Sequence, residues 1–158
     1  MIGPLAWNIL LAMLWMGFTG SFTGTNLFIG LALGYLVLAY ALRGIPAFAN
    51  YATKVPRTIR FIGFFLWELI LSNLKVAYDV LTPTYYMKPG VIAFPLEART
   101  DGEITIVANL ISLTPGTLSL DVSSDRKVLY IHVMYLDDEA EVVKSLRYLE
   151  HRALEVLR

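Results

Sequence analysis

The sequence predicts a membrane-anchored protein built from an α-helical hairpin, a further helix that is amphipathic or transmembrane, and a small α+β domain of order βαββα. Three observations lead to this prediction. Residues 1–42 contain no Asp, Glu, Lys, Arg or His. Residues 61–82 are mostly apolar but carry one stripe of polar side chains. Residues 88–158 carry charges as a soluble domain does, and they alternate between strand-like and helix-like periods.

The composition narrows the classes of function. The chain has 158 residues, of which 56% are hydrophobic and 16% charged, and its formal net charge of +0 gives no indication of nucleic-acid binding. It contains no cysteine, which excludes disulfides, thiol catalysis and cysteine metal sites. The C-terminal part is close to the smallest chain that buries a core of its own, so we expect it to lean on the membrane part or on partners.

Residues 1–43 are predicted to form a two-helix transmembrane hairpin. The apolar runs 4–18 and 26–42 flank the sequence TGSFTGTN, which is typical of a turn. An apolar crossing needs roughly 20 residues, and in hydrocarbon the backbone must satisfy its own hydrogen bonds, so both runs should be helices. A cleaved signal peptide is the alternative, but no basic segment precedes the apolar run and no small-x-small cleavage site stands out.

The second apolar run carries a helix-packing pattern. Gly30 and Gly34 lie one turn apart, and Ala41 extends the same face. Because glycine has no side chain, the backbone of another helix can approach closely at such a face. We expect these residues to help the hairpin dock.

A basic connector, residues 44–60, is predicted to follow the hairpin. Gly44, Pro46 and Pro56 interrupt it and are typical of a linker. No acid accompanies its basic residues, whereas residues 1–25 carry no basic residue. The positive-inside rule therefore places the connector in the cytoplasm, and a hairpin then leaves the N-terminus there too. The basic residues near the spans are Arg43, Lys54, Arg57 and Arg60.

Residues 61–82 are predicted to form a helix with one polar face. Its polar residues recur at spacings of four, three and four: Glu68, Ser72, Lys75 and Asp79. Such a helix either lies in the membrane interface with its stripe in water, or crosses the membrane with the stripe facing another protein. We favour the interfacial helix, because a third crossing puts Glu68 near mid-membrane and conflicts with the basic residues. Glu68, Lys75 and Asp79 are also candidates for an ion path, although an amphipathic face explains them without one.

The predicted C-terminal domain has the order βαββα, with helices covering one side of a sheet. A strand over 91–98 contains Pro95, which is typical of a sheet edge. Asp101 is expected to cap a helix over GEITIVANLIS. TLSLDV and VLYIHV alternate apolar and polar residues and form a hairpin through SSDRK. Asp137 or Asp138 then caps the last helix, EAEVVKSLRYLEHRALEVL. The apolar stripe of this helix comprises Val142, Val143, Leu146, Leu149, Ala153 and Leu157.

The sequence TPGT, Thr114 to Thr117, predicts a type II turn between the first helix of this domain and its second strand. Pro115 supplies the fixed φ of the second turn position, and Gly116 supplies the positive φ of the third. We interpret the turn as structural; a ligand-binding loop is the alternative.

No residue pattern predicts catalysis or a bound cofactor. The sequence has no GxS, P-loop, GxGxxG or HExxH pattern. His132 alternates with Tyr130 on a predicted strand, and one histidine without cysteines or clustered carboxylates cannot form a closed metal site. His151 lies on the charged face of the last helix and is expected to be solvated. We therefore expect neither an enzyme nor a metal or cofactor site.

One stretch resembles a known family. Residues 108–138, ANLISLTPGTLSLDVSSDRKVLYIHVMYLDD, are similar to the signature of the E subunit of multisubunit cation/proton antiporters, the Mrp (also Mnh or Pha) family. The resemblance extends to SNLKVAYDVL at 72–81, to KPGVIAFPL at 88–96, and to the apolar N-terminal hairpin. The departures, at Leu110 and Ile111, are conservative and do not touch the turn.

The resemblance implies a membrane complex that exchanges sodium, or potassium and other monovalent cations, for protons. In that family the large subunits are held to carry the transport path, so the E subunit is implied to be accessory. Its implied partners are the A, B, C, D, F and G subunits and the lipid bilayer. Its implied location is the bacterial inner membrane, as a multi-pass protein with its C-terminal domain in the cytoplasm. A free-standing membrane-anchored binding or sensor domain is the alternative.

Overall fold

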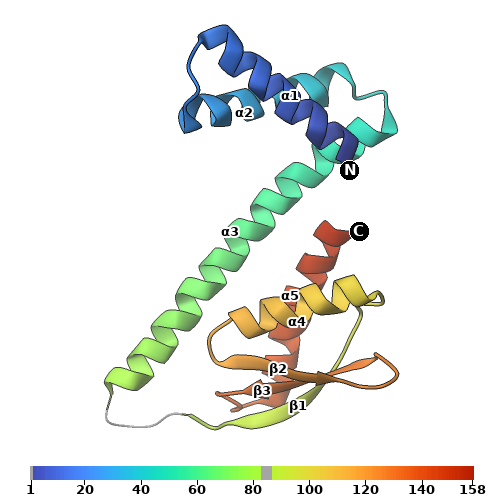
Figure 1. Cartoon of the computed structure of the whole chain (residues 1–158). Coiled ribbons are helices and arrows are strands. Elements are labelled where there is room, and N and C mark those ends of the chain that lie inside the picture. Colours follow the sequence, from blue (N-terminus) through green and yellow to red (C-terminus); the bar gives the residue numbers. More distant parts are fainter. Residues whose placement is uncertain (1, 83–86) are drawn as a thin grey trace. The chain divides into compact units, whose positions relative to one another are not determined.

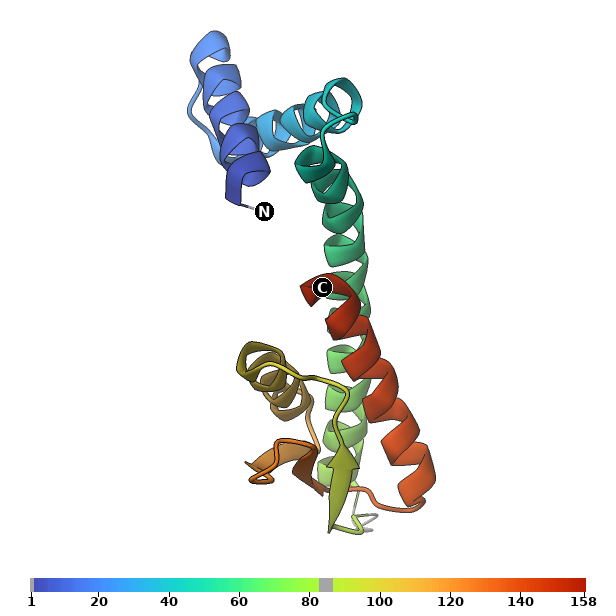
Figure 2. The ribbon, with the colours of Figure 1, turned by 90° about the vertical axis from the view of Figure 1, so that its right-hand side faces the viewer.

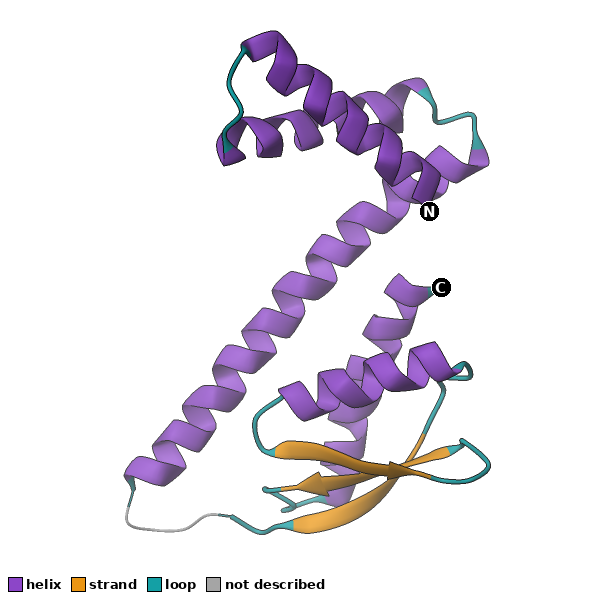
Figure 3. Ribbon diagram, in the orientation of Figure 1, coloured by secondary structure: helices purple, strands orange, loops and turns teal. Residues whose placement is uncertain are grey.

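The computed structural model describes residues 2–82 and 87–158, and it divides into two compact units, Met1–Ile59 and Arg60–Arg158. The Pro/Gly boundary predicted at 81–90 falls partly outside these described residues. Figure 1 labels the elements along the chain, and Figure 3 distinguishes helices from strands. In chain order they are α1 (Ile2–Thr19), α2 (Gly24–Ala41), α3 (Pro46–Leu81), β1 (Gly90–Pro95), α4 (Asp101–Leu113), β2 (Thr117–Val122), β3 (Val128–Val133) and α5 (Glu139–Leu157).

The first unit contains the predicted pair of apolar helices. α1 and α2 are joined by residues 20–23, where the sequence predicted a turn. Thr23 caps α2, because its hydroxyl accepts the backbone N–H of Asn26 at 3.3 Å. By length and composition α2 and α3 are candidates to cross a membrane, and the apolar run of α1 is shorter. The helices predicted over 4–18 and 26–42 are therefore present.

Helix α3 starts earlier than the sequence predicted, because the expected connector over 44–60 is helical from Pro46 onward. Proline suits the first turn of a helix, where its missing N–H would have no helical partner in any case. Pro56 lies inside α3 and leaves the carbonyl of Ala52, four residues earlier, without its helical donor. The hydroxyl of Tyr35 on α2 donates to this carbonyl at 2.8 Å. This bond explains how the helix accommodates a proline.

The second unit contains a three-stranded antiparallel sheet of order β1-β3-β2. The element order β1-α4-β2-β3-α5 agrees with the predicted one, and β1, which ends at Pro95, is an edge strand as expected. The buried residues of the strands alternate along β1 and β3, so they lie on one face of the sheet. That face packs against α4 and α5, and Figure 2 shows α5 running beside the second part of α3. The core comprises Ile92, Phe94, Ala98, Ile104, Val107, Ile111, Leu129, Ile131, Val133, Leu146, Leu149, Ala153 and Leu154.

The helix caps of this unit differ in one case from the prediction. Thr100, rather than Asp101, caps α4: its hydroxyl accepts the N–H of Glu103 at 3.2 Å. The carboxylate of Glu103 in turn accepts the N–H of Thr100 at 3.3 Å, which completes a capping box. Of the two caps predicted for α5, the structure uses Asp138, whose carboxylate accepts the N–H of Ala140 at 2.8 Å.

The apolar stripe predicted on α5 is only partly the buried one. Leu146, Leu149 and Ala153 are buried, but Leu157 near the end of the helix is 37% exposed. Leu154 is buried instead. The stripe shifts because the last turn of α5 extends past the sheet-facing core.

Candidate functional site at the turn of the small domain

The TPGT turn has the predicted backbone geometry. Gly116 has a φ of +90°, and the N–H of Thr117 donates to the carbonyl of Thr114 at 3.2 Å, which closes the turn. The hydroxyl of Thr117 also donates to the carbonyl of Ile111 at 2.6 Å, and that of Thr114 to the carbonyl of Leu110 at 3.1 Å. The Ile111 carbonyl also accepts the backbone N–H of Thr114 at 3.1 Å, so the two threonines together satisfy the Leu110 and Ile111 carbonyls at the end of α4.

The turn positions the ring of Tyr135, just after β3. A Cβ built on Gly116 would lie 3.4 Å from the Tyr135 ring, which is ordinary van der Waals contact, so the ring lies directly beside the turn. The carbonyl of Gly116 accepts the N–H of Met134 at 2.8 Å, which fixes the chain next to the turn. From this position the Tyr135 hydroxyl donates to the carboxylate of Asp79 on α3 at 3.1 Å. Burial of the hydroxyl, followed by its bond to Asp79, raises the pKa of Tyr135 above its ordinary value.

The polar stripe of α3 faces the chain's own small domain, which neither interpretation of the sequence anticipated. The ammonium of Lys75 lies 4.2 Å from the centre of the Tyr135 ring, at cation–π distance. Asp79 is buried. Glu68 and Lys75, together with the four residues of the turn, line a cavity of about 220 Å³. The structure thus brings two groups of predicted residues, the turn and the stripe, into one site.

Apolar contacts hold α3 to the domain at the other end of the stripe. Phe64 makes an edge contact with Tyr148 on α5, with ring centres 5.3 Å apart. The guanidinium of Arg152 lies 5.2 Å from the centre of the Phe64 ring. Phe61 and Phe65 are partly buried against the core.

Glu150 is a buried carboxylate that sequence analysis missed. Its side chain is fully buried, and it accepts the backbone N–H groups of Glu97 and Ala98 at 2.7 and 3.0 Å. Its second oxygen accepts the guanidinium of Arg147 at 2.7 Å. These three donors satisfy the carboxylate and tie α5 to the segment after β1, so its role is structural.

The glycine pattern of the hairpin serves contact within the chain. A Cβ on Gly30 would lie 2.9 Å from the Cα of Ala12 on α1. A Cβ on Gly34 would collide with the amide oxygen of Asn8 and lie 3.2 Å from the Cβ of Leu11. The two glycines therefore let α1 and α2 approach closely, whereas the sequence had suggested docking by another helix.

Polar contacts tie the start of α3 to this hairpin. The amide of Asn8 donates to the hydroxyl of Tyr51 on α3 at 2.7 Å, and Tyr35 bonds to the Ala52 carbonyl as described above. Asn8 is buried, and its amide oxygen has no hydrogen-bond partner in the part of the chain that the structure describes. Pro56 was the sequence signal for one of these contacts, since a proline inside a helix frees a carbonyl.

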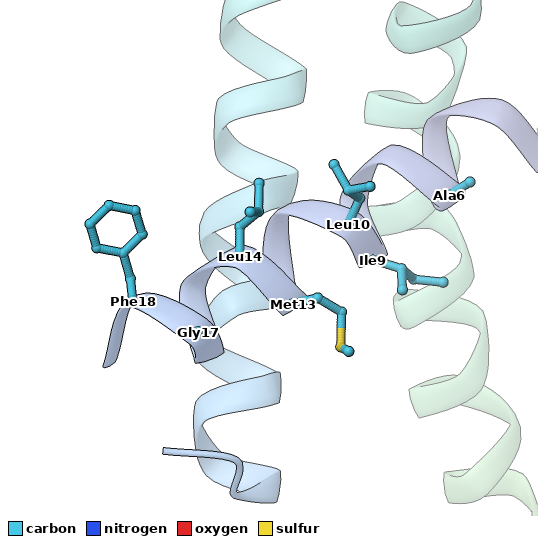
Figure 4. Close-up of a pocket in the computed structure, with 7 residues that line it drawn as sticks. All are labelled: Ala6, Ile9, Leu10, Met13, Leu14, Gly17 and Phe18. Atoms are coloured by element: carbon cyan, nitrogen blue, oxygen red, sulfur yellow. The ribbon is translucent and has the colours of Figure 1, made fainter. Parts of the chain in front are cut away.

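Figure 4 shows a broad apolar hollow along the opposite side of α1. Its side chains include Leu10, Met13 and Leu14, and Phe18 extends away from the helix at its end. All seven residues that line it are apolar: Ala6, Ile9, Leu10, Met13, Leu14, Gly17 and Phe18. This surface offers no group that could bind an ion, and its chemistry suits lipid or another apolar helix.

The remaining predicted residues form no chemical site. His132 lies on the face of the sheet away from the core, paired in register with Val91 and Leu118. His151 is exposed on α5, with its Nε2 3.6 Å from a carboxylate oxygen of Glu155. Among residues 2–82 and 87–158, no group of three or more His, Cys, Asp or Glu residues is placed to hold a metal ion.

Curated relatives are similar along nearly the whole chain. The E subunit of the Na+/H+ antiporter of Alkalihalophilus pseudofirmus is 36% identical over 147 residues, which cover 93% of this chain and 92% of that protein. Its counterpart in Bacillus subtilis, also an E subunit of a Na+/H+ antiporter, is 36% identical over 148 residues, covering 94% and 93%. The turn and the helix that contacts it lie within these matched lengths.

Two solved complexes contain chains of similar structure. A chain of the Mrp complex from Dietzia sp. is 32% identical with a TM-score of 0.52, covering 65% of this chain and 96% of that one. A chain of the membrane-bound sulfane sulfur reductase, an archaeal respiratory membrane complex, is 29% identical with a TM-score of 0.54, covering 92% and 98%. The model of the MnhE family, described as a Na+/H+ ion antiporter subunit, matches residues 8–156. The chain therefore belongs to the E-subunit family of Na+/H+ antiporters, whose members are transporter components and not enzymes.

Proposed function

We propose that the chain is an accessory subunit of a multisubunit monovalent cation/proton antiporter, in which larger partner subunits carry the ions. One observation supports the accessory role above all: α1 and α2 contain no Asp, Glu, Lys, Arg or His. A path for protons or cations through a membrane needs ionisable groups at membrane depth, usually paired or facing a cavity. The apolar pair of helices offers none.

The three candidate ion-path residues have another use. Asp79 and Lys75 both engage Tyr135, and Glu68 lines the cavity beside the turn. Tyr135, which both Asp79 and Lys75 contact, belongs to the C-terminal domain rather than to an apolar helix bundle. We infer that the contacts at this site hold α3 against the C-terminal domain, and that the protein assembles into its complex in this arrangement.

The proposed placement follows from charge and from the family. α1 and α2 span the bacterial inner membrane, and the basic residues after α2 and the C-terminal domain lie in the cytoplasm. Other subunits of an Mrp-type complex are the partners, as the names of the relatives suggest, and the family resemblance implies that these are the A, B, C, D, F and G subunits. The match over residues 8–156 disfavours a free-standing anchored sensor domain.

Reporter fusions test this placement. A reporter fused after Lys54 and another after Arg158 should both read cytoplasmic, and one inserted near Thr23 should read external. Opposite readings after Lys54 and Arg158 would establish a third crossing and overturn the placement.

Deleting the chain tests the accessory role. Cation/proton exchange in membrane vesicles should fall in step with the amount of intact complex. Exchange that disappears while the remaining subunits stay fully assembled would contradict an assembly role.

A further inference from the structure

The outer face of the second part of α3 is apolar and uncovered. Six large apolar side chains on it are each more than half exposed: Ile62, Leu66, Trp67, Ile70, Leu74 and Leu81. At about 1.5 Å per residue, this face is about 30 Å long. A continuous apolar face of that length is unusual on a water-facing domain and indicates a contact surface.

No charge interrupts this face. Glu68, Lys75 and Asp79 all lie on the side that meets the small domain. The polar residue on the outer side, Asn73, donates its amide to the carbonyl of Leu69 at 2.7 Å, so its hydrogen bonding is met within the helix. The outer face is therefore compatible with surroundings that offer few hydrogen bonds.

The side of α3 that contacts the small domain is incompatible with a helix that crosses the whole bilayer. The small domain contacts α3 from Phe64, against Tyr148, to Asp79, against Tyr135. That domain carries charged side chains such as Arg147 and Arg152, which would be costly at membrane depth. The helix thus has a domain on one side and an uncovered apolar surface on the other, which is the pattern of a helix lying at a membrane surface.

The chain itself keeps α3 close to the membrane. α2 ends at Ala41 and α3 begins at Pro46. Five residue steps reach at most about 18 Å, so α3 starts near the end of α2. Arg57 and Arg60 precede the apolar face, and Trp67 and Tyr78 lie along it; these are the residue types that favour the interface between lipid and water.

We propose that this outer face of α3 lies in the cytoplasmic surface of the lipid bilayer and holds the small domain against the membrane. Its apolar side chains enter the boundary between headgroups and acyl chains, to a depth of about 5–10 Å. The polar stripe on the opposite side then faces the domain, where Asp79 is buried and Lys75 lies against the Tyr135 ring. This inference rests on the proposed membrane placement of α1 and α2.

The absence of cysteine allows a direct test by single-cysteine spin labels in the reconstituted complex, with partner subunits that carry no reactive cysteine. Labels at Ile62→Cys, Ile70→Cys and Leu81→Cys report the outer face. Leu14→Cys on α1 reports hydrocarbon depth, and Glu141→Cys on α5 reports water. The readouts are collisions with oxygen, which enters lipid, and with a water-soluble nickel chelate.

We expect the three α3 labels to lose most chelate collisions, to keep oxygen collisions, and to report one shared shallow depth. Labels at Ile62 and Leu81 that report opposite sides of the bilayer would mean that α3 crosses it. Loss of both kinds of collision would mean that a neighbouring protein covers the face, and free access of the chelate would mean that water does. Each of these three results overturns the proposal.

The Leu14 label separates this failure from failure of the proposed function. A water-like reading there would overturn the membrane placement of the hairpin itself, and with it the inference for α3. A hydrocarbon reading at Leu14 with a deep, covered or water-like reading at Ile70 would overturn the α3 inference alone.

Discussion

The two units of this chain differ in the number of their charged groups and in how their polar groups are hydrogen-bonded. In the first, α1 and α2 have no charged side chain, and the polar contacts to α3 are single pairs: Asn8 with Tyr51, and Tyr35 with the Ala52 carbonyl. In the second, one buried carboxylate, Glu150, gathers three donors, and charges are spread over the surface. The first arrangement suits a medium without water, where the backbone must satisfy itself. The second suits a domain whose surface is hydrated.

The units also differ in how their elements approach each other. α1 and α2 touch through glycines, with space for no added carbon at Gly30 or Gly34. The small domain packs branched and aromatic side chains between a sheet and two helices. Helices in lipid have no hydrophobic drive to associate, so they depend on van der Waals packing and interhelical hydrogen bonds, and small residues allow the close backbone approach that this packing needs. We therefore expect substitutions to damage the two units by different routes.

The largest effect is expected at the glycine contact of the first unit. Gly34→Leu places a side chain where Asn8 and Leu11 already lie, and overpacking costs typically about 1–3 kcal/mol and occasionally more; we expect a value at the upper end here, because the collision includes a buried side chain on the facing helix. The purified chain in detergent should melt at a clearly lower temperature, and membranes should contain little intact complex. Gly17→Leu, where nothing lies within 4 Å, is the matched control. An unchanged melting temperature for Gly34→Leu would mean that the contact is misplaced.

The next effect is expected at the turn of the second unit. Gly116→Val puts a β-branched residue at a φ of +90°, a strain of about 1–3 kcal/mol. The variant should lower the stability of the chain to urea. Gly116→Asn should recover part of the loss, because asparagine tolerates positive φ better than valine. Equal stability of the valine and asparagine variants would contradict the backbone explanation.

A smaller effect is expected where the turn contacts α3. Tyr135→Phe removes the bond to Asp79, worth about 1 kcal/mol, and keeps the ring against Gly116 and Lys75. Because the pKa of Tyr135 is raised above 10.0, this contribution should be constant below pH 10 and be lost as the pH rises through the raised pKa. Urea unfolding of both chains from pH 7 to 12 measures it.

Tyr130→Phe, on the exposed face of the same sheet, is the control for the tyrosine prediction. It should change stability little at any pH. A Tyr135→Phe effect no larger than that of Tyr130→Phe would mean that the hydroxyl does not stabilise the contact between α3 and the small domain.

The smallest effect is expected at the exposed capping box of α4. The Arg158 side chain, followed by the backbone N–H of Arg99, lowers the pKa of Glu103 from 4.5 to about 2. Its contribution to stability should be full above pH 4.5 and disappear as the pH falls through about 2. The melting temperature of the native chain should therefore approach that of Glu103→Gln on acidification. A difference that stays constant from pH 7 to 2.5 would refute this account of the carboxylate.

Local patterns predicted most of the fold, and contacts between distant residues account for what was missed. The Pro115-Gly116 pair fixed the turn, because its backbone demands are local. Thr100 was overlooked although Glu103 follows at capping-box spacing, so that signal was readable. The burial of Glu150 could not be predicted in this way, because the backbone N–H groups that it accepts follow a strand far away in the sequence.

The stripe on α3 shows the same limit at the candidate site. Its spacing predicted one polar face, but the partner of that face, Tyr135, lies far along the chain, and no local spacing links it to the stripe. Pro46 and Pro56 suggested a linker because proline usually interrupts a helix. Pro46 is accommodated because it lies in the first turn of α3. Pro56 is accommodated because Tyr35, on another helix, donates a hydrogen bond to the carbonyl that the proline leaves without a donor. Tertiary contacts therefore decided both points.

The central claim is that transported ions do not meet the side chains of this protein. Glu68 tests it most directly, because it lines the cavity beside the turn and is a carboxylate on the longest helix. Cation/proton exchange should be measured in membrane vesicles with Glu68→Gln and divided by the amount of intact complex. The account predicts exchange per complex equal to that of the native protein. Loss of exchange in a fully assembled Glu68→Gln complex would contradict it and place α3 in the ion path.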